Sequence, residues 1–301
     1  MMAKMSKMLL ALLLVLVTVL ATACVDTGEL KLPVSTTGDA GSVSGEEGTK
    51  PQSGEAVTVE ETVLFEAEGV KVTVKGLEKD LFGTELKLLV ENSSDKNVLL
   101  TADSVSANGY MISASLYTEV AAGKKCNDSL SLSKSSLEQS GIETLSQLQF
   151  YLKLQDPDTW DTVKTSDLLT VTTSAADYVQ PVDDSGDVVY DAQGYKVVCK
   201  GLKQDFIWDG TVVFYMENTG NRAVSIYAEN VSVNGFMQSV SLWSDLRPNT
   251  RIVDGMSMLD LSDLEITNID EIESIEFNLR IVDAETWQEI VTTDAITLNF
   301  A

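Results

Sequence analysis

VLFEAEGVKVTVKGL at residues 63–77 returns as VVYDAQGYKVVCKGL at residues 188–202, with eight of the fifteen positions identical. Shorter matches follow in the same order along the chain. They are NGYM at 108–111 with NGFM at 234–237, Glu91-Asn92 with Glu217-Asn218, and Phe150, Asp156 and Trp160 with Phe277, Asp283 and Trp287. The repeat is too long for a solenoid unit, so each copy is predicted to be a complete domain.

Within each copy, apolar and polar residues alternate with a period of two, which indicates strands with one buried face. Val70, Val72 and Val74 alternate with polar neighbours. The same alternation recurs at Leu86, Leu88 and Val90, at Val212, Phe214 and Met216, at Leu148, Phe150, Leu152 and Leu154, and at Ile275, Phe277, Leu279 and Ile281. This pattern is typical of antiparallel sheets with one face on the core.

Turn and cap signals divide these strands. Asn108-Gly109 and Asn234-Gly235 predict tight hairpins, because both residue types tolerate positive φ. Ser-x-x-Glu, the pattern of a helix-capping box, predicts one short helical turn in each copy. It occurs at Ser135 and Glu138 and again at Ser262 and Glu265, with Gly141 and Asn268 as the expected left-handed caps.

The predicted fold is therefore all-β: two tandem immunoglobulin-like antiparallel β-sandwich domains, each with one short helical turn. The predicted boundaries are a signal peptide at 1–23, a disordered tether at 24–60, repeat 1 at 61–174, a linker at 175–186 and repeat 2 at 187–301. The tether is rich in Gly, Ser and Thr, and its length gives a root-mean-square span of roughly 30–35 Å.

The N-terminus carries an export signal. Lys4 and Lys7 precede an apolar run at 8–20 that is too short for a comfortable membrane span. Ala21-Thr22-Ala23 before Cys24 resembles a bacterial lipobox with Ala21 where leucine is usual, and predicts lipidation of Cys24. The same residues fit ordinary signal peptidase cleavage, so secretion without a lipid is the alternative.

Charge and histidine content exclude several classes of function. The chain has 21 basic and 46 acidic residues and a net charge of −25, so no nucleic-acid partner is expected. Histidine is absent, which removes Ser-His-Asp and Cys-His catalysis and histidine-ligated zinc. No phosphate-binding glycine loop occurs either. The protein is predicted to be no enzyme and to use no cofactor.

The two cysteines of the repeats are predicted to be structural. Cys199 takes the place of Val74, and Cys126 takes the place of Ile252 in the second copy. Each replaces an aliphatic residue in a strand, as a small buried hydrophobe does. A disulfide between them would join non-equivalent positions in two domains, and is the alternative.

One acidic cluster raises the question of a metal site. Asp156, Asp158 and Asp161 surround Pro157 and Trp160, with a spacing that some calcium sites use. The sequence Asp-Pro-Asp also favours a tight turn. The second copy has fewer acidic residues at the equivalent turn, namely Asp283 and Glu285. No metal site is therefore predicted, and calcium at these three residues is kept as an alternative.

Aromatic residues give the candidate ligand contacts. Tyr117 and Trp243 are equivalent, and Trp208 with Phe206 occupies a loop-like stretch that has no tryptophan in the first copy. Tryptophan on a loop stacks on sugars or anchors protein partners, and the alternative is that these rings cap the ends of the sandwich core.

The repeats resemble uncharacterised extracellular domains in lipoproteins of low-GC Gram-positive bacteria, many from the gut. The residues that carry the resemblance lie at 66–72, 88–92, 108–111 and 156–160. It implies an immunoglobulin-like sandwich on the outer face of the cytoplasmic membrane, and it brings no catalytic residues. The expected function is a non-catalytic surface lipoprotein that binds a protein or glycan; the alternative is a passive spacer or envelope-maintenance component.

Overall fold

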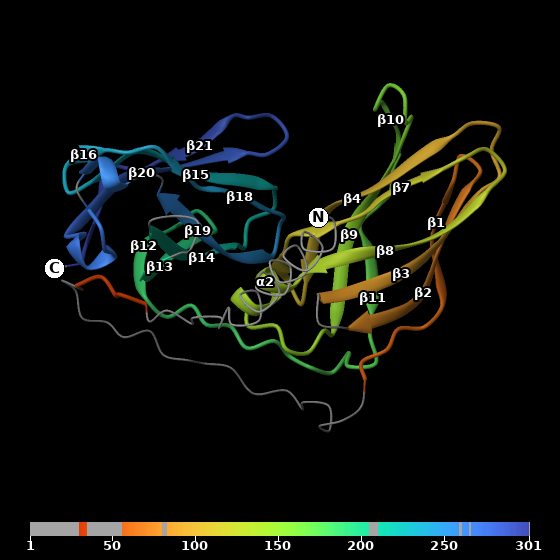
Figure 1. The fold of residues 1–301 in the computed structure, drawn as a ribbon, viewed down its shortest axis with the longest axis horizontal. Helices are drawn as coiled ribbons and strands as arrows, with labels where there is room; N and C mark the ends of the chain where they lie inside the picture. The colour runs from red at the N-terminus through yellow and green to blue at the C-terminus, as the bar shows by residue number, and fades with distance from the viewer. Residues whose placement is uncertain are drawn as a thin grey trace, which may run out of the picture. The chain divides into compact units, whose positions relative to one another are not determined.

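The computed structural model shows an all-β protein with two successive sandwich-like arrangements, which confirms the predicted fold class (Figure 1). The structure describes residues 30–34, 56–79, 83–204, 210–258, 261–264 and 266–300. Cys24, Phe206, Trp208 and Glu265 lie outside these residues.

The strands of the two copies correspond one to one along the chain. Those of the first copy are β1 (Thr62–Ala67), β2 (Val70–Lys79), β3 (Gly83–Asn92), β4 (Val98–Ala107), β5 (Tyr110–Met111), β6 (Ala114–Ser115), β7 (Tyr117–Val120), β8 (Lys125–Ser133), β9 (Gln147–Gln155), β10 (Thr162–Thr165) and β11 (Leu169–Thr172). Those of the second copy are β12 (Asp187–Ala192), β13 (Tyr195–Lys203), β14 (Gly210–Asn218), β15 (Val224–Val233), β16 (Phe236–Met237), β17 (Val240–Ser241), β18 (Trp243–Leu246), β19 (Thr250–Met258), β20 (Ser274–Asp283), β21 (Glu289–Thr292) and β22 (Ile296–Asn299).

Each copy pairs its strands in two sheets. In the first, β1-β2-β3-β8-β6 form one sheet, and β10-β9-β4, with β5, β7 and β11, form the other. In the second, β12-β13-β14-β19 with β17 face the sheet of β16-β15-β20-β21 with β18 and β22. A single parallel pairing, Arg251 of β19 with Tyr110 of β5, joins sheets of the two copies.

Two clusters of buried side chains follow from the predicted alternation. Every apolar residue of the alternating runs is at most 1 % exposed. One cluster consists mainly of buried side chains of the first copy, and the other consists of buried side chains of the second copy. Val198 and Tyr215 of the second copy pack in the first cluster. The division into two separate domains stays a prediction.

Both Asn-Gly hairpins form as predicted. Asn108 and Gly109 have φ of 50° and 83°, and Asn234 and Gly235 have 50° and 82°. These left-handed values are what a two-residue turn between twisted antiparallel strands requires.

The helical turns differ from the prediction. In the first copy α2 (Lys134–Gln139) begins after Ser133, whose hydroxyl accepts from the Ser136 backbone N–H, so the cap lies two residues before Ser135. In the second copy the 3₁₀ turns η1 (Leu261–Leu264) and η2 (Ile269–Glu271) take its place. Asn268 caps the start of η2 with φ of −146°, and is therefore no left-handed C-cap.

Part of the predicted tether contacts the second copy. The backbones of Lys31 and Leu202 exchange two hydrogen bonds of 2.8 Å, and the Val34 N–H donates to the Asn299 carbonyl. The Lys31 ammonium also donates to the carbonyls of Asp270 and Ile272 at 3.0 and 3.3 Å. At least residues 31–34 are thus placed against β13 and β22.

Cys126 and Cys199 are free thiols, so the alternative disulfide is absent. Cys199 is buried in the second core as predicted, whereas Cys126 is only partly buried. Among the residues described, no helix is long and apolar enough to cross a membrane.

Candidate functional site

A row of aromatic rings lies on the solvent side of the second copy. Trp243 on β18 stands directly opposite Tyr227 on β15, and their rings stack with centroids 5.2 Å apart and planes within 7°. Trp287 follows at 5.5 Å from Trp243. Trp243 is 50 % exposed and Trp287 is 58 % exposed, so these rings do not cap the core. We call Tyr227, Trp243 and Trp287 the aromatic row.

The acidic turn after β20 holds Trp287 in place. The Asp283 carboxylate accepts from the backbone N–H groups of Glu285 and Thr286, and the Trp287 N–H donates to the Asp283 carbonyl. Trp287 itself has φ of +60°. Hydrogen bonds from Thr286 lower the pKa of Asp283, so the carboxylate that shapes the turn is charged at neutral pH.

Polar side chains fix the other end of the row. The Trp243 indole N–H donates to Asp245 at 3.1 Å, and the Ser225 hydroxyl donates to the same carboxylate at 2.5 Å. The Arg280 guanidinium lies 5.7 Å from the centre of the Tyr227 ring and pairs with Glu229 at 3.0 Å. The row is therefore held in one orientation before any ligand arrives, which lowers the entropy cost of binding.

The first copy carries a smaller version of this surface. Tyr117 and Trp160 lie with their ring centroids 6.0 Å apart, and both are more than half exposed. Thr101 stands opposite Tyr117, where the second copy has Tyr227. The surface of the first copy therefore has two rings, and that of the second copy has three.

The turn that carries Trp160 explains the acidic cluster of the first copy. Asp156 accepts from the N–H groups of Asp158 and Thr159, and Asp161 accepts from the Thr159 hydroxyl. These bonds give Asp156 and Asp161, two of the three carboxylates of the calcium alternative, a role in shaping the turn. Within the described part of the chain, no group of three or more acidic or cysteine side chains is spaced to hold a metal ion.

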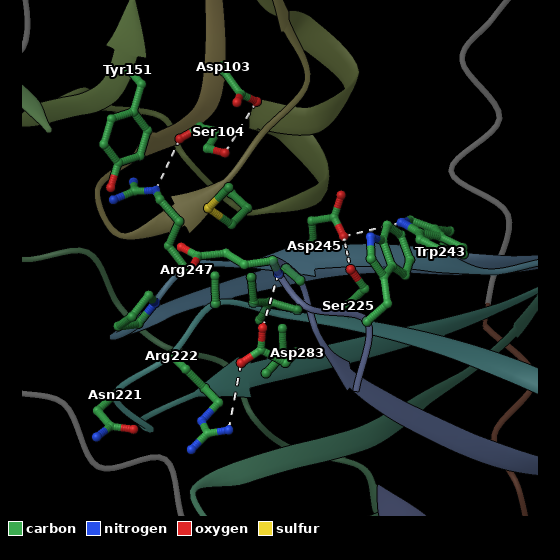
Figure 2. Close-up of a pocket in the computed structure, with 18 of the residues that line it drawn as sticks. Asp103, Ser104, Tyr151, Asn221, Arg222, Ser225, Trp243, Asp245, Arg247 and Asp283 are labelled. Atoms are coloured by element: carbon green, nitrogen blue, oxygen red, sulfur yellow. Dashed lines mark hydrogen bonds and ion pairs between the residues drawn. The ribbon is translucent and has the colours of Figure 1, made fainter. Parts of the chain in front are cut away.

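A groove of about 740 Å³ opens beside the aromatic row (Figure 2). Trp243 and Trp287 line one part, and Asp103, Ser104 and Tyr151 of the first copy line another. Its size is that of a site for a small ligand or a short stretch of polymer.

Arg247 connects the two copies within this groove. Its guanidinium donates to the Ser104 carbonyl at 3.1 Å and to the Ser106 hydroxyl at 2.5 Å, and it lies over the Tyr151 ring. Figure 2 shows the side chain reaching from the second copy toward Ser104 and Tyr151. Burial lowers the pKa of Arg247, because desolvation disfavours the charged guanidinium.

Both charge signs line the groove. Arg222 pairs with Asp283 at 3.6 Å, and Asp245 is held by Ser225 and Trp243. Flat apolar rings beside polar groups that both donate and accept hydrogen bonds are suited to a ligand with an apolar face and a rim of hydroxyls.

The sequence identified part of this site. Tyr117 and Trp243 occupy equivalent positions of the two copies, both are exposed, and each lies against the tryptophan of its acidic turn. Tyr227 and Arg247 were missed, because their equivalents in the first copy are Thr101 and Ala121. The cross-strand pairing of Tyr227 with Trp243 is the signal that would have found the row.

Comparisons with known proteins give no family and no argument about this chain. No protein-family model matches the chain, and no curated protein matches it. Among solved structures, the YadV chaperone aligns over 71 % of this chain and 91 % of its own, at 11 % identity and a TM-score of 0.22. A protein of unknown function from Porphyromonas gingivalis W83 aligns over 69 % and 89 %, at 10 % identity and a TM-score of 0.18. Such low scores support no argument about function.

Proposed function

We propose that this protein is a non-catalytic, exported lipoprotein that binds an extracellular glycan through the aromatic row of its second copy. The observation that supports it most is the row itself: Trp243 lies against both Tyr227 and Trp287, and both tryptophans are at least half exposed. A sugar ring presents flat C–H faces that stack on such rings, while its hydroxyls meet the polar groups beside them.

The location belongs to the same proposal. An export signal with Cys24 at its end supports an acylated protein on the outer face of the cytoplasmic membrane, and the resemblance to lipoproteins of low-GC Gram-positive bacteria agrees with it. Fatty-acid labelling that persists in Cys24→Ala would contradict this part.

The binding proposal is tested by affinity electrophoresis in gels that contain soluble polysaccharides: β-glucan, xylan, mannan and solubilised peptidoglycan. Retardation of the protein by one of these is expected, and Trp243→Ala should weaken it about tenfold, as the loss of one well-placed stacking contact does. Val179→Ala is the control, because Val179 is a similarly exposed apolar residue outside both the aromatic row and the groove.

Two outcomes would contradict glycan binding. One is equal retardation of wild type and Trp243→Ala. The other is silence of the wild type across a wide panel, which would favour the passive spacer. If immobilised envelope proteins retain this protein and Trp243→Ala weakens that retention, the aromatic row would be the binding surface and its ligand would be a protein.

A further inference from the structure

The same hairpin is buried in the first copy and exposed in the second. Tyr110 and Met111, after the first Asn-Gly turn, are 2 % and 7 % exposed. Phe236 and Met237, after the second, are 62 % and 67 % exposed. Large apolar side chains that gather on one exposed hairpin make it a candidate interaction surface.

The first hairpin is covered by the second copy. The Arg251 N–H of β19 donates to the Gly109 carbonyl at 3.0 Å, and Arg251 pairs with Tyr110 in a parallel bridge. The Arg251 guanidinium lies 5.5 Å from the Tyr110 ring centre and is held by Glu217 at 3.0 Å. A hairpin of one repeat thus docks on the strand edge of the next repeat.

The first copy carries the equivalent strand edge, and that edge is open. Lys125 of β8 stands where Arg251 stands in β19, and it forms the equivalent ion pair, with Glu91. Beyond β3, the described strand that pairs with β8 is β6, at Ser131 and Leu132 only. The edge near Lys125 therefore has no strand partner among the described residues, and the side chains of Lys125 and Asn127 are exposed.

We propose that the exposed hairpin of the second copy docks on the β8 edge of the first copy of another molecule of this chain. The repeat-to-repeat contact inside the chain is the template for this contact between chains. It is heterologous, because hairpin and edge are different surfaces, so each molecule in a pair retains one of each and the association is head-to-tail.

The contact between chains is weaker than its template. Asn127 replaces Val253, and Leu89 replaces Tyr215, on the face that receives the hairpin. Ala121 replaces Arg247, whose two hydrogen bonds join the copies inside the chain. Association is therefore expected in the high micromolar range or above, which crowding on a surface favours over dilute solution.

Sedimentation velocity across increasing protein concentration tests the proposal. The weight-average sedimentation coefficient of the wild type should rise with concentration. Phe236→Ser and Met237→Ser should each weaken association about tenfold, since a large apolar side chain then stays in water. Val179→Ser removes an exposed apolar side chain elsewhere and should change nothing.

A mixing experiment separates head-to-tail from symmetric pairing. Phe236→Ser retains an intact edge, and Asn127→Glu retains an intact hairpin but places a charge on the edge. Each variant alone should remain monomeric, and their mixture should form dimers that grow no further. Ala121→Arg should strengthen association of the otherwise unchanged chain. Asn230 and Ser232 of the second copy are equivalent to Ser104 and Ser106, which accept hydrogen bonds from Arg247 inside the chain, so the new arginine would meet the equivalent strand.

Several results would overturn the proposal. A wild type and an Ala121→Arg variant that both stay monomeric up to millimolar concentration would do so. Association that is insensitive to Phe236→Ser would do so as well, and so would a mixture of the two defective variants that stays monomeric. Melting curves of each variant ensure that a loss of association reflects the surface and not unfolding.

Discussion

At the residue scale, Asp254 shows how burial sets a dependence on pH. Burial raises the pKa of its carboxyl, although the Ser244 hydroxyl donates to it at 2.7 Å. A carboxyl whose pKa is raised by folding holds its proton more tightly in the folded state. Its contribution to stability is full at acid pH and is lost as pH rises from the unfolded pKa, about 3.9, through the folded value.

Asp254→Asn should therefore flatten the fall in the free energy of unfolding as pH rises above about 4. Ser244→Ala should steepen it, because that hydroxyl favours the charged form. Urea titrations of the three proteins at several pH values measure both slopes. Equal slopes would show that the carboxyl is not desolvated.

Cys199 gives a second prediction at this scale. Burial raises the pKa of its thiol to about 12, and its side chain lies in the second core. Iodoacetamide at pH 8 should leave Cys199 unmodified in the native protein and modify it in urea. Mass spectrometry of the labelled peptide reads this directly. Rapid native labelling would mean that β13 opens to solvent.

At the element scale, the Asn-Gly hairpins were predictable and their attachments were not. Positive φ at both residues follows from residue type alone. The sequence does not say that the Asn108 amide donates to the Thr144 carbonyl, or that its oxygen accepts from Ser146 and Gln147. These partners lie far along the chain, and only the closed fold brings them together.

Asn108→Ala should cost about 2–3 kcal/mol of unfolding free energy, because the turn loses its preferred φ and several partly buried polar groups lose their partners. Asn108→Gly relieves the turn strain but not the lost hydrogen bonds, so it should recover less than half. Asn234→Ala, at the more exposed second hairpin, should cost less. Chemical denaturation measures all three, and a harmless Asn108→Ala would contradict this account.

The short helix illustrates the limit of local signals. Ser133, Ser135 and Ser136 all lie within four residues at the end of β8, and a serine at any of these positions can cap a helix. Strand β8 extends through Ser133, so the helix begins there, before the capping box at Ser135. In the second copy the backbone takes up two 3₁₀ turns instead. The boundary depends on where a neighbouring strand stops pairing.

At the scale of the whole molecule, the repeat and its strands could be predicted because the same alternation of apolar and polar residues occurs in both copies. The contact between the copies could not, because duplication says nothing about how one copy meets the next. Arg247, Tyr215 and Val198 provide that contact, and their equivalents are Ala121, Leu89 and Thr73. Differences between the copies, not their similarities, marked the interface.

Arg247 is therefore expected to couple the unfolding of the two copies. Arg247→Ala removes the hydrogen bonds to Ser104 and Ser106 and should separate thermal unfolding into two transitions in calorimetry. Arg247→Lys retains the charge but not the planar fork, and should give an intermediate trace. A trace that is unchanged in Arg247→Ala would show that the apolar contacts alone couple the copies.

The pairing of Lys31 with Leu202 has a consequence for the orientation of an acylated chain. The interval from Cys24 to Lys31 reaches at most about 24 Å when fully extended. If Cys24 carries a lipid, as proposed, the attachment point at Lys31 on the second copy would lie within that distance of the acylated residue. The reach of a lipid-anchored chain would then be set by the interval from Cys24 to Lys31, and not by the whole segment up to residue 60.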